Sequence, residues 1–136
     1  MKHNQHFIPV LAALIKNEKG EFLIAQRKPM LNNGGKWEFP GGKLQLGEVP
    51  EDCLTREIKE ELGIEIIVED PFQIVNQPYS ERSILLISYF CEYVSGDINL
   101  KDHDQVEWVK PDLLIQYDLS EPDKTIAAKL NDFHRD

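Results

Sequence analysis

The sequence predicts one α/β (α+β) domain in which a mixed β-sheet is flanked by helices. Runs of β-branched and aromatic residues, separated by turn-forming residues, recur along most of the chain and indicate strands. Two segments, residues 50–62 and 122–133, begin with proline and then contain no glycine or proline, which is typical of helices. With 136 residues, 41% of them hydrophobic, the chain suits one core better than two, so we expect residues 1–136 to form a single domain.

The first part of the chain is expected to form a hairpin followed by a loop. The apolar run at residues 7–15 and the run at 21–27 read as two strands joined by the turn sequence NEKG. Residues 28–36 are rich in Gly, Asn and Pro, which predicts a loop. The segment WEFPGGK, residues 37–43, then brings a short apolar piece into a glycine-rich turn ahead of the first helix.

The first helix is predicted to begin at Pro50 and to end at Leu62, because Gly63 suits the left-handed position after a helix. Pro111 opens a short helical piece, and the second helix closes the chain. The remaining strands are expected at residues 64–68, 72–76, 83–93 and 106–109. The long run at 83–93 is predicted to be central in the sheet.

The net charge of −9 argues against duplex DNA and anionic membranes as partners, because both are bound mainly through Lys and Arg. Cys53 and Cys91 lack the spacing of a zinc site or a disulfide framework, so we expect both to stay reduced. The apolar run at 7–15 is too short to span a bilayer and is not followed by a cleavage site. The expected location is the cytoplasm.

Carboxylates are concentrated on one side of the first predicted helix. Glu57, Glu60 and Glu61 fall within an arc of roughly 100°, beside an apolar arc, and Glu48 can fold back toward them. Arg56 lies four residues before Glu60 and can pair with a carboxylate from behind. Such convergence is unfavourable without a cation, and Mg²⁺ prefers carboxylate, water and phosphate oxygens. An acidic helix face of this kind is otherwise simply exposed to water.

The complete sequence motif decides between a metal site and a merely solvent-exposed acidic face. Gly42, five residues, Glu48, seven residues and then REIKEELGI at 56–64 resemble the signature of the Nudix hydrolases at every defined position. WEFPGGK further resembles the MutT-like nucleoside triphosphate pyrophosphohydrolases of that family. The resemblance runs from the first strand to the last helix. It implies an α/β/α sandwich and a reaction, dependent on Mg²⁺ or possible with Mn²⁺, that releases a nucleoside monophosphate and pyrophosphate.

The resemblance also implies roles for residues. Glu60 and Glu61 are expected to bind the metal, together with the carbonyl of Gly41. Glu57 is expected to be either a further metal ligand or the base that activates water. Supporting roles are implied for Glu48 and Arg56.

Two loops are expected to complete the site. Lys43 either contacts a phosphate or the attacking water, or is simply exposed to solvent. Family members often carry one more acidic residue before a late strand that ends in Trp, and Asp102 fits this position better than Asp104. Both aspartates otherwise only solubilise a turn. His103 is interpreted as a loop histidine and not as a metal ligand.

The choice of base depends on fewer residues. Arg27 matches a position that faces the nucleotide in MutT-like enzymes, and Tyr79 and Phe7 either stack on the base or belong to the core. Asp123 replaces the Asn of relatives specific for oxidised guanine, and an ionised Asp only accepts hydrogen bonds. It otherwise only adds charge to the first turn of the last helix.

Asp123 resembles the CTP pyrophosphohydrolase branch, so (d)CTP and modified cytosine nucleotides are the expected substrates. The alternatives are an 8-oxo-dGTP diphosphatase and a non-catalytic nucleotide-binding protein. The chain is expected to be a monomer or a homodimer, and a free nucleotide is the expected partner.

Overall fold

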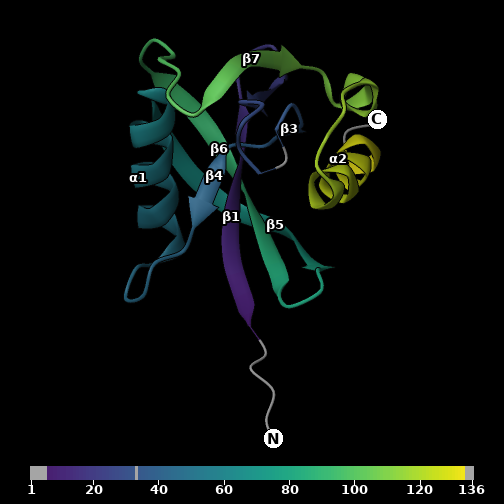
Figure 1. Cartoon of the computed structure of the whole chain (residues 1–136). Helices are drawn as coiled ribbons and strands as arrows, with labels where there is room; N and C mark the ends of the chain where they lie inside the picture. Colours follow the sequence, from purple (N-terminus) through teal and green to yellow (C-terminus); the bar gives the residue numbers. More distant parts are fainter. Residues whose placement is uncertain (1–5, 33, 134–136) are drawn as a thin grey trace, which may run out of the picture.

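The computed structural model describes residues 6–32 and 34–133 and shows two long helices on opposite sides of one sheet (Figure 1). Residue 33, within the expected loop, and both ends of the predicted domain lie outside the described residues. The elements in chain order are β1 (Phe7–Lys16), β2 (Phe22–Arg27), β3 (Trp37–Glu38), β4 (Gly41–Lys43), α1 (Pro50–Leu62), β5 (Glu65–Pro78), β6 (Ser83–Ser95), β7 (His103–Val109), the 3₁₀ helix η1 (Pro111–Gln116) and α2 (Glu121–Phe133).

The sheet is mixed, as the sequence predicts. Its main path is β3-β2-β1-β6-β5, with β1 and β6 parallel and the other neighbours antiparallel, while β7 adds to β2. The hairpin of β1 and β2 pairs only where Lys16 meets Phe22. Farther along, the short strand β4 lies beside β1 instead, opposite residues 10–12. Because β1 changes its partner from β2 to β4 in this way, the glycine-rich turn lies next to the middle strand of the sheet.

The strands after α1 differ from the expected pattern most clearly at β5, and β7 begins at His103, three residues earlier than expected. The two runs at 64–68 and 72–76 belong to one strand, β5, whose register with β6 shifts around Pro71. The intervening Glu, Asp and Pro suggest a turn, but β5 lies at the edge of the sheet, where a bulge tolerates a proline without an N–H donor. β6 is an inner strand, paired with both β1 and β5.

Helix α1 has the predicted bounds. It begins at Pro50, and Gly63 follows it in the left-handed conformation with φ of 75°, donating its N–H to the carbonyl of Lys59. The apolar side of the helix is fully buried against one face of the sheet. That packing orients the adjoining, acidic side of α1 toward β4 and the loop before β7.

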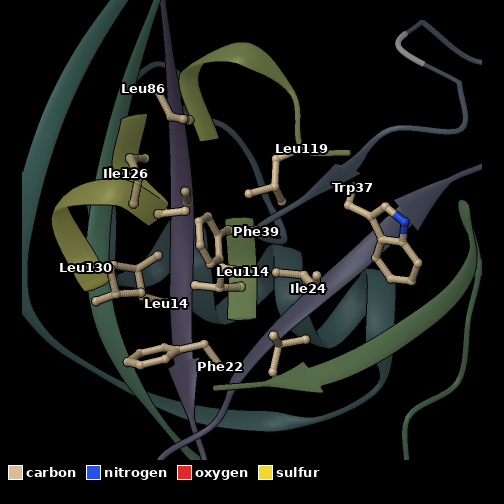
Figure 2. Packing of buried hydrophobic residues seen from close by; sticks show 13 residues of the cluster. Leu14, Phe22, Ile24, Trp37, Phe39, Leu86, Leu114, Leu119, Ile126 and Leu130 are labelled. Carbon is tan, nitrogen blue, oxygen red and sulfur yellow. The ribbon is translucent and has the colours of Figure 1, made fainter. Parts of the chain in front are cut away.

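A second core fills the other face of the sheet. Figure 2 shows Ile126 and Leu130 of α2 packed near Leu14 and Phe39, with Phe22 and Ile24 in the same cluster. Because each helix buries its apolar side against a different face, the molecule is the expected α/β/α sandwich. Within the described residues, no helix is long and apolar enough to cross a membrane.

Candidate active site

A cavity of about 520 Å³ opens between β1, the β3–β4 turn, the β5–β6 turn and the start of α2. Five residues singled out from the sequence contribute to its wall: Arg27, Gly41, Lys43, Tyr79 and Asp123. Phe7 does not, and it is 60% exposed, so its alternative assignment to the core is wrong. The cavity therefore connects the glycine-rich turn beside α1 to the base of α2.

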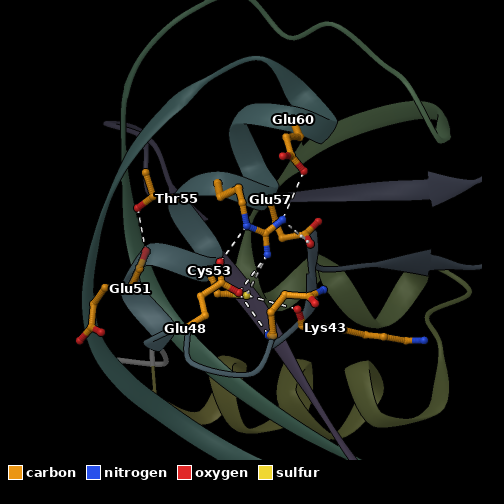
Figure 3. Close-up of polar contacts among 9 residues, drawn as sticks. Lys43, Glu48, Glu51, Cys53, Thr55, Glu57 and Glu60 are labelled. Atoms are coloured by element: carbon orange, nitrogen blue, oxygen red, sulfur yellow. Dashed lines mark hydrogen bonds and ion pairs between the residues drawn. The ribbon is translucent and has the colours of Figure 1, made fainter.

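Arg56 organises the carboxylates on the acidic side of α1. Its Nε and Nη2 lie 2.8 and 3.0 Å from the two carboxylate oxygens of Glu48. Its Nη1 lies 3.1 Å from Glu57 and 3.3 Å from Glu60, and Figure 3 shows these three carboxylates converging on the guanidinium. The hydrogen bonds from Arg56 lower the pKa of Glu48 to about 2, and Glu48 in turn raises the pKa of Arg56.

Glu57 lies directly against the glycine-rich turn. A Cβ atom added to Gly42 would be 2.4 Å from the carboxylate carbon of Glu57, so only glycine leaves room for that side chain. Gly41 is more restricted, because its Cβ would be 1.8 Å from the backbone oxygen of Leu11, which cannot turn aside as a side chain can. The two glycines thus bring the β4 backbone, with the Gly41 carbonyl, close to both the central strand and the Glu57 carboxylate.

Glu61 is oriented differently from the other glutamates. Its pKa is raised, first by burial and then by the neighbouring carboxylate of Asp102. The loop that carries Asp102 is held near β2 by the backbone bond from Lys28 N–H to the Asp102 carbonyl, 3.4 Å long. Both candidate aspartates are exposed, but Asp102 is the one beside Glu61, and Asp104 lies on β7. A helical projection alone does not reveal this pairing.

The acidic residues suit a divalent cation chemically. Within the described ranges, no set of three or more acidic, His or Cys side chains is gathered closely enough to hold a metal ion as it stands. Glu57 and Glu60 both point to Arg56, while Glu61 points to Asp102. Burial and the neighbouring Asp102 and Glu57 carboxylates raise the pKa of Glu61, and His103 offsets this only in part. Hard oxygen donors are the ligands that Mg²⁺ and Mn²⁺ prefer. These residues therefore fit such an ion.

The environment of Asp123 differs from what the sequence interpretation assumed, which was an ionised carboxylate. Its side chain is buried, and its Oδ1 accepts a 3.0 Å hydrogen bond from the Phe39 backbone N–H. Burial, and next the nearby charge of Glu38, raise the pKa of Asp123 to about 8. At neutral pH this carboxyl is mostly protonated, so it can donate as well as accept a hydrogen bond. The expectation that Asp123 only accepts is wrong.

The raised pKa of Asp123 predicts a pH-dependent stability. Between pH 4 and pH 8 the folded chain holds a proton on Asp123 that the unfolded chain has lost, so the contribution of this group becomes less favourable as pH rises. We expect Asp123→Asn to narrow the difference in melting temperature between pH 5 and pH 9, measured by thermal unfolding. Asp112→Asn, at an exposed aspartate of η1, is the control and should leave the difference unchanged.

Two residues of the cavity wall, Glu38 and Arg82, and one residue behind it, His103, were not identified from the sequence as site residues. Glu38 accepts hydrogen bonds from Arg27 Nη1, 3.3 Å away, and from His103 Nε2, 2.9 Å away. His103 is 4% exposed and begins β7, so its interpretation as a loop histidine is wrong. Arg82 contributes to the cavity from the β5–β6 turn, which its carbonyl closes by accepting from Tyr79 N–H at 2.7 Å. No local pattern signals the long-range contact between Glu38 and His103.

Comparisons with known proteins agree with this geometry. Residues 6–130 match the model of the NUDIX domain. The chain is 34% identical over 116 residues to the CTP pyrophosphohydrolase of Escherichia coli (strain K12), with 85% of each chain covered. It is 30% identical over 123 residues to the 8-oxo-dGTP diphosphatase of the same organism, covering 90% of this chain and 95% of the relative. The crystal structure of a MutT protein from Methanosarcina mazei Go1 superimposes with a TM-score of 0.88 at 30% identity, covering 99% of this chain and 100% of that one.

Proposed function

The chain belongs to the Nudix hydrolase family, and on that premise we propose that it hydrolyses free nucleoside triphosphates to a nucleoside monophosphate and pyrophosphate. Cytosine nucleotides, (d)CTP or modified forms, are the preferred substrates in this proposal, and the activity serves to cleanse the nucleotide pool. The required ion is Mg²⁺, or alternatively Mn²⁺. The net charge of −9 favours a small nucleotide over polymeric nucleic acid or a membrane.

The observation that carries the proposal is the continuity of the cavity with the acidic side of α1. Gly41, Gly42 and Lys43 form part of the cavity wall, and the Glu57 carboxylate lies directly behind Gly42. A nucleotide whose base enters the cavity near Asp123 can therefore extend its phosphates along β4 toward the carboxylates. Arg27, Lys43 and Arg82 supply positive charge in the same cavity.

The positions of the residues, together with the family resemblance, support the following roles. Glu57 would accept the proton of the attacking water. The water oxygen bonds to one phosphorus of the α–β linkage, the bond from that phosphorus to the bridging oxygen breaks, and nucleoside monophosphate and pyrophosphate separate. Arg56 holds the carboxylates of Glu48 and Glu57 in place through charge-assisted hydrogen bonds. Glu60 and Glu61 would hold the divalent ion together with the Gly41 carbonyl, with Asp102 nearby, and Glu57 would be a further ligand if it is not the base. When bound, that ion neutralises phosphate charge and lowers the pKa of water.

A protonated Asp123 can form hydrogen bonds with cytosine. A neutral carboxyl can accept from the exocyclic amine of cytosine and donate to its ring nitrogen at the same time, which is a paired hydrogen-bond pattern. The similarity to a CTP pyrophosphohydrolase supports the same choice. The proposed preference for cytosine thus rests on hydrogen bonds between the base and a neutral Asp123 carboxyl, and does not require an ionised aspartate.

The second candidate is 8-oxo-dGTP, and the same protonated carboxyl favours it. Oxidised guanine presents a donor and an acceptor side by side on its imidazole-ring edge, which a neutral Asp123 matches as an Asn amide would. Only a charged Asp123, unable to donate, would disfavour this substrate, and burial raises the pKa of Asp123 to about 8. A non-catalytic nucleotide-binding role is less favoured because all the signature carboxylates are present.

A substrate panel tests the function. We expect Mg²⁺-dependent release of pyrophosphate from CTP, 5-methyl-dCTP or 8-oxo-dGTP, with the highest kcat/KM for a cytosine nucleotide. A dinucleoside polyphosphate and a nucleotide sugar complete the panel. Turnover of these two compounds alone would contradict the proposed substrate class, and nucleotide binding without turnover in Mg²⁺ or Mn²⁺ would favour the non-catalytic alternative.

A further inference from the structure

We propose that His103 is a positioning residue: it fixes the Glu38 carboxylate at the wall of the base pocket and so sets the affinity for the nucleobase without contacting the nucleotide. The inference rests on the proposed function, because it assumes that the cavity near Asp123 receives a base. It assigns to His103 a role at the base and not in the chemistry at the phosphates.

The contacts of His103 support this role. Its Nε2 is 2.9 Å from Glu38 Oε2, and because a carboxylate only accepts, Nε2 carries the proton of this bond. The same Oε2 accepts from Arg27 Nη1 at 3.3 Å. The side chains of Glu38 and Arg27 retain 22% and 28% exposure, whereas His103 retains 4% and does not contribute to the cavity wall. The imidazole therefore supports two wall residues from behind.

An irregularity in the sheet gives His103 this orientation. Along β2 the next partner after Gln26 is Arg27, but along β7 the partners are Gln105 and then His103. Asp104 is therefore the extra residue of a bulge, and it is exposed. A bulge reorients the neighbouring side chain and commonly occurs near functional sites. Here the bulge lies next to His103, whose imidazole is buried. In an exposed loop the same ring would be solvated.

His103 lies between the two halves of the site, which makes its role testable. Asp102, the preceding residue, faces Glu61 of the proposed metal set, whereas Glu38 lies near Asp123 in the cavity. A role through Glu38 affects recognition of the base. A role through Asp102 affects the reaction itself. A purely structural role of a buried ring changes stability alone.

Two polar variants of similar size separate these roles. The amide of Gln can reach the position of Nε2, whereas the shorter amide of Asn falls nearer Nδ1. We expect His103→Asn to raise KM for CTP about tenfold, the loss typical of one charge-assisted hydrogen bond, with kcat changed less than twofold. His103→Gln should restore KM to within about threefold of the original chain. Thermal unfolding of both variants reports any loss of folded protein.

The decisive comparison uses a substrate without a base. Ribose 5-triphosphate carries the same triphosphate and sugar, so His103→Asn should leave its kcat/KM unchanged. In a Glu38→Gln background, His103→Asn should add no further increase in KM for CTP, since the two residues act as one unit. Equal losses for CTP and ribose 5-triphosphate, or losses that add in the double variant, would overturn the inference.

Failure of the proposed function gives a different result. In that case the original chain releases pyrophosphate from neither compound, and binding of CTP, measured by isothermal titration calorimetry with Ca²⁺, replaces KM in the comparison. The same tenfold weakening in His103→Asn and its rescue in His103→Gln are then expected. Unchanged CTP affinity in His103→Asn, or no binding of CTP to the original chain, would overturn the inference.

Discussion

Glu57→Gln is expected to lower kcat by about 10²–10⁴-fold, the range for loss of a positioned general base. The variant keeps the size of the side chain but removes the group that accepts the proton of water or binds the metal. Arg56 retains its bidentate partner Glu48 in this variant, so the local structure should persist. The measurement is pyrophosphate release at saturating substrate over a series of Mg²⁺ concentrations.

Glu51→Gln is the matched control for this prediction. Glu51 is exposed on the same helix and faces away from the three carboxylates that converge on Arg56 (Figure 3). We expect its kcat to stay within twofold of the original chain, because a distant surface charge is screened by salt. If Glu57→Gln kept more than a tenth of the original kcat at high Mg²⁺, neither role proposed for Glu57 would hold.

The parts of the fold that depend on local sequence could be predicted. The bounds of α1 follow from Pro50 and Gly63, and the pairing of Arg56 with Glu60 follows from a spacing of four residues on a helix. β5 could not be predicted as one strand, because Pro71 locally resembles a turn. Only the partner strand β6 and the position at the sheet edge make the bulge there acceptable.

The missed parts of the site depend on contacts between distant segments. His103 and Glu38 are 65 positions apart, and Phe39 and Asp123 are 84 apart. No local period brings such residues together, and the raised pKa of Asp123 arises from its complete burial next to Glu38. Sequence reasoning could identify Asp123 as a candidate but could not give its protonation state.

Gly41→Ala is expected to destabilise the fold by about 3 kcal/mol, the upper range for overpacking a closely packed site. The added Cβ would be 1.8 Å from the backbone oxygen of Leu11, on the strand that lies at the middle of the sheet. β1 is paired with β6 over its whole length and cannot move aside without breaking those bonds. Urea denaturation followed by circular dichroism measures the loss.

Gly42→Ala is the control. Gly42 follows Gly41 on the same strand, but a Cβ at Gly42 would clash with a side chain and not with backbone. Its added Cβ would collide only with the carboxylate of Glu57, the movable end of a side chain. We therefore expect a stability loss below about 1 kcal/mol but a displaced Glu57, with kcat reduced at least about tenfold. Equal stability losses in the two variants would mean that β4 yields to both clashes. The close approach of β4 to β1 would then not be what positions Glu57.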